Sequence, residues 1–297
     1  YSMDNIEQFG ETIDEKTVAW AIENKYLVDY SLIDIVNTQE EINEIMDSLN
    51  VMGILDESPH KDYATNLKNR DKIDELFLAS YIAIKEICDI DNLDKLLIYA
   101  NTTQHADIIK YLCNIILNSG ICDINSQEFY CNDLHSNRTD LDIKKELKKF
   151  QKAKKGIISC VQLFGEGYNE PLLDGVVFAE KMESEIRIIQ SSLRPHRLNK
   201  NKTDKHAYII IPRLDFEAAD EENKEQNPFK KIEQIGIHLR NVDENIYSKI
   251  ETKHYSKKYK SLNHISFKGF EVSPDFKKAK PSGSDAKAEV RVVFSDS

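Results

Sequence analysis

Three polar residues late in the chain have types and spacing suited to binding phosphate. Gln190, Arg194 and Arg197 stand at positions i, i+4 and i+7, so they share one face of a helix or its frayed end. Pro195 prevents that helix from running on cleanly. Two guanidinium groups held at a helix end suit bidentate contact with a phosphate group. Taken alone, the two arginines are explained equally well by surface salt bridges.

A glycine loop precedes these residues in the chain. Gly165, Glu166 and Gly167 follow the apolar run at 156–161. In open α/β sheets, ligands bind beyond the carboxyl ends of the strands, and glycines there let the backbone approach a phosphate or a sugar closely. The loop therefore predicts a ligand contact, although the same pattern also fits a simple tight turn.

Several catalytic motifs are missing from the sequence. It contains no G-x-x-x-x-G-K-[ST] for cradling nucleotide phosphates and no D-E-x-[DH] for holding Mg²⁺. The esterase pattern G-x-S-x-G and the metalloprotease pattern H-E-x-x-H are also missing. A hydrolase that is complete within this chain is therefore disfavoured.

The chain is acidic overall, but its charge is unevenly distributed. The 297 residues carry a formal net charge of −11. Residues 1–75 hold 18 acids against 6 bases, whereas residues 144–202 hold 13 bases against 7 acids. Residues 246–280 hold 9 lysines against 3 acids. The two basic stretches suggest local attraction to a polyanion such as DNA or RNA, although a solvated helix face explains the first of them as well.

Composition also bears on metals, compartment and membranes. The five cysteines include no C-x-x-C pair, so zinc ribbons and small disulfide scaffolds are disfavoured, and we expect no metal site. Reduced thiols indicate a cytoplasmic protein. No apolar stretch is long enough to span a membrane. The Asn/Lys/Ile-rich composition suggests an AT-rich genome, so a viral factory or virion is the alternative location.

Short apolar runs alternate with helical patterns through the middle of the chain, which is typical of a parallel sheet covered on both faces. The sequence thus predicts a doubly wound α/β domain of about six strands. Helices are expected at 14–24, 39–50, 71–88, 105–117, 139–154 and 183–193, with a polar loop at 56–70. The expected strands are 26–36, 95–101, 128–132, 156–161, 173–179 and 206–212.

The predicted domain has segments on either side. Residues 1–25 are interpreted as a connector from a preceding domain, since Tyr1 looks like a cut end, and residues 26–212 as the α/β domain. Residues 213–297 are interpreted as a helical extension, with a helix or helix pair at 229–251 and a basic tail around Lys253–Lys260. In that tail, Tyr255 and Tyr259 are spaced to stack on bases. The Gly/Ser start of residues 282–297 indicates a loosely attached end, which is either native or added.

Residues 95–212 resemble the second RecA-like domain of a superfamily 2 helicase. They are similar to the DEAD/DEAH-like group that includes restriction-enzyme subunits and helicases of large DNA viruses. The segment Phe9–Tyr30 resembles the passage out of the first domain. LLIYANTTQHA (96–106) is similar to motif IV, residues 150–178 to the motif V region, and IIQSSLRPHR (188–197) to motif VI.

The resemblance implies roles for individual residues. Motif IV would place Asn101, Thr102 and Thr103 on the nucleic-acid backbone, with Tyr168 joining them. Motif V covers Gly165, Glu166, Gly167, Tyr168, Asn169, Pro171 and Asp174, of which Gly165, Glu166, Gly167 and Asn169 would contact the nucleotide. Motif VI would supply Gln190, Arg194 and Arg197 as catalytic residues.

Two positions depart from the family pattern. Asn169 replaces the usual Asp of motif V, which weakens a contact to the nucleotide ribose. Leu193 replaces the usual Gly of motif VI, and Pro195 follows the first arginine.

The missing phosphate and Mg²⁺ motifs belong, in this family, to the first RecA-like domain. The chain is therefore predicted to be the second half of a motor that hydrolyses ATP with Mg²⁺ only when the first domain is present. DNA or RNA and that first domain are its expected partners.

One alternative is a non-catalytic helicase-like scaffold in RNA processing or transcription. A more remote one, an unrelated Rossmann-type enzyme, lacks G-x-G-x-x-G.

Overall fold

The structure is a computed structural model, which describes residues 16–120, 128–135, 137–161, 171–182, 184–215, 229–254 and 265–266. The motif V residues Gly165, Glu166, Gly167, Tyr168 and Asn169 lie outside these ranges. So do Tyr255, Tyr259 and residues 282–297.

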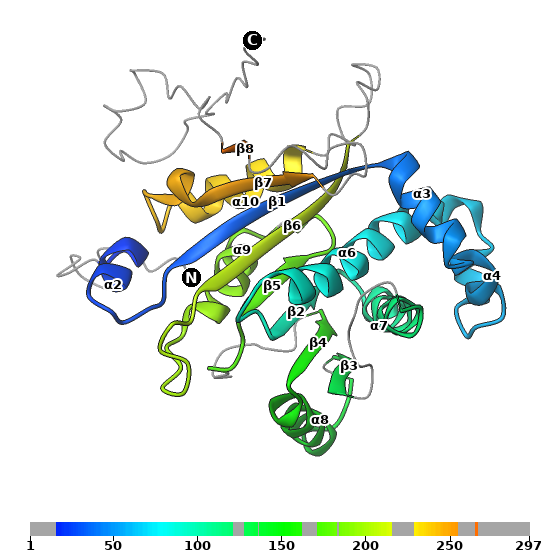
Figure 1. Cartoon of the computed structure of the whole chain (residues 1–297), viewed down its shortest axis with the longest axis horizontal. Coiled ribbons are helices and arrows are strands. Elements are labelled where there is room, and N and C mark those ends of the chain that lie inside the picture. Colours follow the sequence, from blue (N-terminus) through cyan, green and yellow to red (C-terminus); the bar gives the residue numbers. More distant parts are fainter. Residues whose placement is uncertain are drawn as a thin grey trace, which may run out of the picture.

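One sheet forms the centre of the described part of the chain (Figure 1). Its strand order is β3-β4-β2-β5-β6-β1-β7-β8, and all neighbours are parallel except the antiparallel pair β7 and β8. All six predicted strands are present, which confirms the RecA-like doubly wound α/β fold. The strands are β1 (Tyr30–Thr38), β2 (Lys95–Tyr99), β3 (Phe129–Leu134), β4 (Lys155–Cys160), β5 (Gly175–Phe178), β6 (Ala207–Asp215), β7 (Ile250–His254) and β8 (Ile265–Ser266).

Two of these strands were not predicted. Residues 229–251, expected to be a helix or helix pair, form α10 (Phe229–Arg240), a 3-10 turn (Ile246–Lys249) and the start of β7. The sequence of β7, IETKH, carries little strand signal of its own, and its pairing with β1 comes from the tertiary fold. The sheet therefore continues beyond residue 212.

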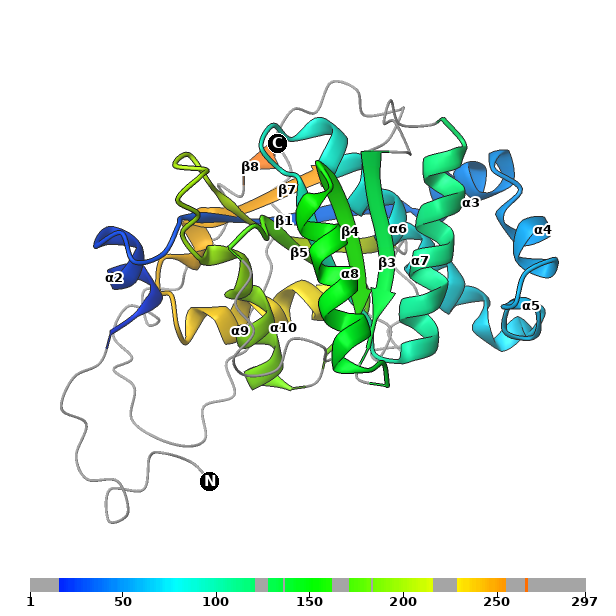
Figure 2. The ribbon, with the colours of Figure 1, turned by 90° about the horizontal axis from the view of Figure 1, so that it is seen from below.

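Helices cover both faces of the sheet (Figures 1 and 2). Helices α3, α4, α6 and α7 pack on one face around an apolar core that includes Ile33 and Ile35 of β1. Helices α8, α9 and α10 pack on the other face around Leu32. Their bounds are α3 (Gln39–Ser48), α4 (Val51–Asp56), α6 (Arg70–Asp89), α7 (Thr103–Asn118), α8 (Asp140–Lys152) and α9 (Glu185–Ser192).

Short elements complete the described chain. The stretch 56–70, expected to be a polar loop, contains the one-turn helix α5 (Lys61–Ala64) and a 3-10 turn (Leu67–Asn69). These turns close through local backbone hydrogen bonds, which require no apolar periodicity. The short helix α2 (Val18–Glu23) precedes β1, and the N–H of Val18 donates to the carbonyl of Val242.

The parallel strands give the sheet two distinct edges. Segments that follow β2, β3, β4 and β5 lie at the carboxyl edge, and segments that precede β1, β5 and β6 lie at the amino edge. A five-residue strand such as β2 separates the two edges by roughly 16 Å. The predicted nucleic-acid residues Asn101–Thr103 follow β2, whereas Arg197 precedes β6.

Candidate functional site

The predicted phosphate-binding residues lie where helix α9 ends. Helix α9 stops at Ser192, a 3-10 turn runs from Arg194 to His196, and Arg197 is extended, with φ −69° and ψ 137°. Gln190 therefore lies in the helix, while the two arginines lie on its frayed end. Pro195 favours this ending because it has no N–H for a continuing helix. We call residues 194–197 the arginine turn.

The backbone of the arginine turn is fixed from two sides. Leu27 forms an antiparallel bridge with Arg197, and the N–H of Val28 donates to the carbonyl of His196 at 2.8 Å. On the other side, the Lys205 ammonium donates to the carbonyl of Arg197 at 2.8 Å. The extended conformation of Arg197 is thus set by neighbours on both the preceding and the following segments.

Lys205 also connects the arginine turn to the motif V region. Its side chain is buried, and its ammonium donates to the Pro171 carbonyl at 2.8 Å as well as to Arg197. At the other end of segment 162–170, a guanidinium nitrogen of Arg187 in α9 donates to the Val161 carbonyl at 3.2 Å. Both ends of the segment that carries the glycine loop are therefore tied to the α9 region.

The charge of Arg194 reaches the sheet beneath α9. Burial raises the pKa of the Cys160 thiol to about 12, and the guanidinium groups of Arg194 and Arg187 oppose that rise. Cys160 is the last residue of β4, directly before Val161. The charges of Arg187 in α9 and of Arg194 in the arginine turn thus act on Cys160, at the end of β4.

The arginine turn contains a buried histidine that packs against β1. His196 has no exposed surface, and its ring contacts Tyr30 edge-on at a centroid distance of 4.6 Å. Burial lowers the pKa of His196 to about 3, with further lowering by Lys249 and Lys205, so its ring is neutral at physiological pH. The Tyr30 hydroxyl donates to Asp243 at 2.8 Å. The segment after α10 is therefore coupled to the arginine turn.

Asp174, which falls on motif V, has a structural position. Its carboxylate is buried and accepts from the backbone N–H groups of Asp94 and Lys95 at 3.0 and 3.1 Å. The Lys202 ammonium donates to it at 3.0 Å. Burial raises the pKa of Asp174, and Lys202 opposes the rise. This carboxylate holds the starts of β2 and β5 together at the amino edge.

The predicted nucleic-acid residues form the loop between β2 and α7. Asn101, Thr102 and Thr103 are all exposed at the carboxyl edge. The Asn101 side chain donates to the Lys181 carbonyl at 2.9 Å, and the Thr102 hydroxyl caps α7 by accepting from the N–H of His105 at 3.0 Å. Two of the three side chains therefore already shape the loop, and Thr103 begins the helix.

Sequence reasoning missed the acid that holds this loop. Glu180 is almost fully buried and accepts from the N–H of Asn101 at 2.7 Å and from His105 Nδ1 at 3.0 Å. Lys72 lies 3.2 Å from the same carboxylate. Burial alone would raise the pKa of Glu180, but these partners lower it to about 2. The sequence signal for Glu180 was an acid two residues after the apolar run of β5. At that position the carboxyl ends of neighbouring parallel strands lie close together.

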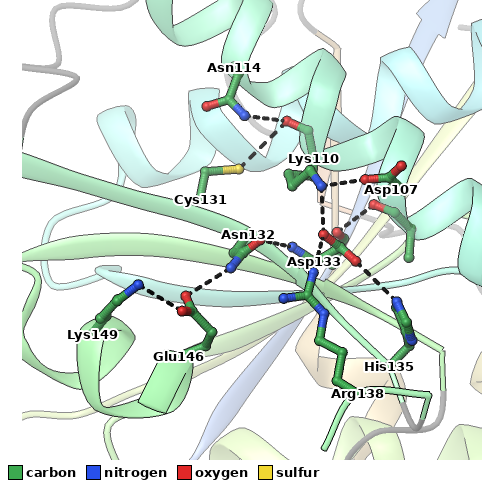
Figure 3. Close-up of polar contacts among 12 residues, drawn as sticks. Asp107, Lys110, Asn114, Cys131, Asn132, Asp133, His135, Arg138, Glu146 and Lys149 are labelled. Atoms are coloured by element: carbon green, nitrogen blue, oxygen red, sulfur yellow. Dashed lines mark hydrogen bonds and ion pairs between the residues drawn. The ribbon is translucent and has the colours of Figure 1, made fainter. Parts of the chain in front are cut away.

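A second ionic network lies at the carboxyl end of the edge strand β3 (Figure 3). Asp133 accepts from the Lys110 ammonium at 2.7 Å and from the Arg138 guanidinium at 2.8 Å. Burial alone would raise the pKa of Asp133, but these two hydrogen bonds lower it. Lys110 also pairs with Asp107. The network fastens α7 and the segment after β3 to the edge strand, and its cations are matched by carboxylates.

Neither a metal cluster nor a membrane span was found in the part of the chain that the structure describes. Within those residues, no group of three or more His, Cys, Asp or Glu side chains could hold a metal ion. No helix among the same residues is long and apolar enough to cross a bilayer.

The comparisons to known proteins agree with a RecA-like α/β domain. Residues 79–199 match the family described as the helicase conserved C-terminal domain. The resemblance to a helicase C-terminal domain is thus confirmed over these residues. No curated protein sequence matches the chain significantly.

Several solved structures are similar to this chain at low sequence identity, and the first of those described here shares its fold. A chain of the ATP-dependent type ISP restriction-modification enzyme LlaBIII bound to DNA is 17% identical, with a TM-score of 0.64 over 86% of this chain. The Mss116p DEAD-box helicase domain 2 bound to an RNA duplex is 14% identical, covering 77% of this chain and 66% of its own, with a TM-score of 0.43. A fragment described as an HsdR subunit of a type I restriction enzyme from Vibrio vulnificus YJ016 is 18% identical, covering 71% of this chain and 38% of its own, with a TM-score of 0.47. This chain spans 18% of the length of the LlaBIII chain.

Proposed function

We propose that this chain is the second motor domain of an ATP-dependent nucleic-acid helicase or translocase. It supplies arginine fingers to an ATP cleft that an N-terminal first domain completes. The observation that supports the proposal is that Lys205 donates to the carbonyls of both Pro171 and Arg197, while Arg187 of α9 donates to the carbonyl of Val161. These bonds bring Val161 and Pro171, which flank the glycine loop in the sequence, to the α9 region.

The residue types at the arginine turn suit the anionic end of a nucleotide. ATP, held with Mg²⁺ by the first domain, supplies the phosphoryl group that is transferred to water. Arg197 acts as the finger that neutralises charge developing on that group, Arg194 lies beside it, and Gln190 orients the pair. The neighbours of Arg197 fix its backbone, so less freedom is lost when the cleft closes.

Gly165, Glu166, Gly167 and Asn169 contact the nucleotide from the loop that Arg187 and Lys205 anchor. The nucleic-acid backbone crosses the opposite edge of the sheet over Asn101–Thr103, and Tyr168 is a further contact residue of the resemblance. There the N-terminus of α7 favours a phosphate electrostatically, and Glu180 fixes the shape of the loop.

The experiment joins this chain to its N-terminal motor domain and measures ATP hydrolysis with and without single-stranded DNA or RNA. Hydrolysis that either strand stimulates, and that Arg194→Ala or Gln190→Ala reduces, supports the proposal. Nucleic-acid binding without any hydrolysis would support the scaffold alternative instead.

A further inference from the structure

Helix α8 presents a row of lysines on its outward side. The helix packs on β3 and β4 through the buried Leu147 and Phe150, at the outer end of the sheet (Figures 1 and 2). Because the helix has 3.6 residues per turn, four lysines lie on the side opposite these two residues. All four are exposed, and we call them the lysine face: Lys145, Lys148, Lys149 and Lys152.

The lysines of this face repel one another. Lys148 lies three residues after Lys145 and four before Lys152, and like charges at these spacings destabilise a helix. On α6, by contrast, a lysine meets an acid at such a spacing, as in the pair Lys72 and Glu75. Stability of the isolated helix therefore does not explain why α8 carries this row.

Acids of the chain do not neutralise the row. Among the described residues, Glu146 lies 2.7 Å from Lys149, and no ion pair joins Lys145, Lys148 or Lys152 to an acid. Three of the four charges on the lysine face thus remain available to an anionic ligand.

The helix dipole does not account for the row either. Cations near a helix C-terminus stabilise its last carbonyls, but Lys145 and Lys148 lie before the last turn of α8. The last carbonyls already have a cation, because the buried ammonium of Lys95 donates to Phe150 at 2.6 Å and to Ala153. Lys95 therefore fixes the end of the helix and leaves the lysine face directed outward.

The composition of the exposed side favours a phosphate backbone over a protein or a membrane. The buried centres of protein interfaces are depleted in lysine and enriched in aromatic residues. A helix that lies in a membrane surface needs an exposed apolar side, whereas the apolar side of α8 is buried against the sheet. Leu141 is the only strongly exposed apolar side chain of α8.

A duplex fits the face better than a single strand does. Proteins that bind single strands combine basic grooves with aromatic side chains that stack on the bases, and the only aromatic residue of α8, Phe150, is buried. A DNA duplex keeps its bases inside and presents one phosphate charge per about 1.7 Å of axis. From Lys145 to Lys152 the face extends roughly 10 Å, so it spans several of these charges.

We propose that the lysine face of α8 binds the phosphate backbone of a nucleic-acid duplex. The inference rests on the proposed function for the choice of nucleic acid as the polyanion. It adds a contact separate from the loop Asn101–Thr103, since α8 follows β3 and the loop follows β2, two strands away in the sheet. At roughly 10 Å, that separation lets a duplex on α8 adjoin a single strand on the loop.

The test measures binding of this chain to a labelled blunt DNA duplex and to a labelled single strand by fluorescence anisotropy. Lys148→Gln combined with Lys152→Gln weakens duplex binding about tenfold at 50 mM salt and lowers the slope of log K against log salt by about 1.8. Affinity for the single strand stays within about twofold of wild type. The corresponding pair of Lys→Arg substitutions keeps both charges and the duplex affinity.

Two controls accompany the glutamine pair. Lys25→Asn combined with Lys200→Gln removes the same charge from exposed positions beside β1 and β6, and leaves duplex affinity within about twofold. Asparagine suits position 25 because it tolerates the left-handed φ of 61° there. The melting temperature of the glutamine pair stays at or above wild type, because glutamine has a similar helix propensity and the repulsion between Lys148 and Lys152 is gone.

Four results would overturn the inference. The first is a duplex affinity that the glutamine pair leaves unchanged, or that wild type lacks at 50 mM salt. The second is an equal loss in the control pair, which would reduce the effect to net charge. The third is an equal loss for the single strand, which would place the face on the single-strand path. The fourth is binding of phosphatidylserine vesicles that the glutamine pair removes while duplex binding persists, which would assign the face to a membrane.

These binding measurements need no hydrolysis, so the inference and the proposed motor can fail separately. Duplex binding that depends on the lysine face, in a two-domain protein that never hydrolyses ATP, would preserve the inference and end the motor proposal. Normal hydrolysis together with an unchanged duplex affinity in the glutamine pair would end the inference alone.

Discussion

The buried ammonium of Lys205 lies 2.8 Å from the carbonyl oxygen of Arg197. It bonds equally to Pro171, at the end of the segment that carries the glycine loop. A single side chain thereby sets the spacing between two segments that are more than twenty residues apart.

Lys205→Met should disturb both carbonyls, because a thioether cannot donate to them. We expect a loss of about 1–3 kcal/mol in the free energy of unfolding, the usual effect of leaving buried groups unsatisfied. We also expect a fall in kcat in the two-domain protein that is larger than the loss of ATP affinity. Denaturant melts and steady-state ATPase rates measure the two effects. A variant with full turnover and reduced stability would make Lys205 purely structural.

Glu180 should make stability depend on acid pH. Its pKa is lowered from 4.5 to about 2, so the folded state favours the ionised form. The resulting stabilisation, roughly 3 kcal/mol, is complete above the unfolded pKa and is lost as the pH falls from about 5 to 2. Glu180→Gln should flatten this pH dependence, whereas Glu23→Gln, which alters an exposed acid, should not. Identical acid melting curves for Glu180→Gln and the wild type would contradict the assignment.

Nucleic-acid binding by this chain should be weak and sensitive to salt. The net charge of −11 opposes long-range attraction, and the contacts at Asn101–Thr103 are directed to phosphate. With about three phosphate contacts, the Kd should rise about twentyfold between 50 and 200 mM salt. Fluorescence anisotropy with a labelled single strand measures this rise. An affinity that does not change with ionic strength would argue against a surface that follows phosphates.

The first lysine of the predicted basic tail is paired within the fold. Lys253, at the start of the predicted tail, lies in β7 and pairs with the buried Glu86 at 3.0 Å. Its charge is therefore matched within the fold.

The chain alone should neither hydrolyse ATP nor bind it tightly. It holds one wall of the proposed cleft, and its sequence lacks the phosphate loop and the Mg²⁺ motif. A phosphate-release assay on the purified chain checks this. Turnover above the buffer blank, removed by a mutation within the chain, would refute the half-motor account.

The sequence predicted the sheet because its central strands are short, continuous apolar runs, such as 95–101, which are recognisable without any partner. It did not predict β7, because IETKH is polar and its place depends on the free edge of β1. Helix ends shifted by a few residues where caps decide them, as at Ser184, whose hydroxyl accepts from the N–H of Arg187 and starts α9 at Glu185 rather than at 183.

In the candidate site, too, the residues of local sequence patterns could be predicted, and those that depend on tertiary contacts could not. Spacing and the resemblance singled out Gln190, Arg194 and Arg197 as candidates, because a motif is a local pattern, and their roles stay predictions. Lys205 and Glu180 were missed, because a buried lysine or glutamate looks like any surface residue until the fold brings its partners together. Nothing in the sequence pattern indicates that Arg187 bonds to Val161 or that Lys205 bonds to Pro171.

Arg197 carries the central claim, so its substitution in the two-domain protein is the most direct test. Arg197→Ala should lower kcat by a factor of about 10³ or more, with nucleic-acid affinity and melting temperature near wild type. Arg197→Lys should recover little, because a point charge cannot reproduce the planar fork. An alanine variant with near-normal turnover, or one that melts early and is partly rescued by lysine, would contradict the arginine finger.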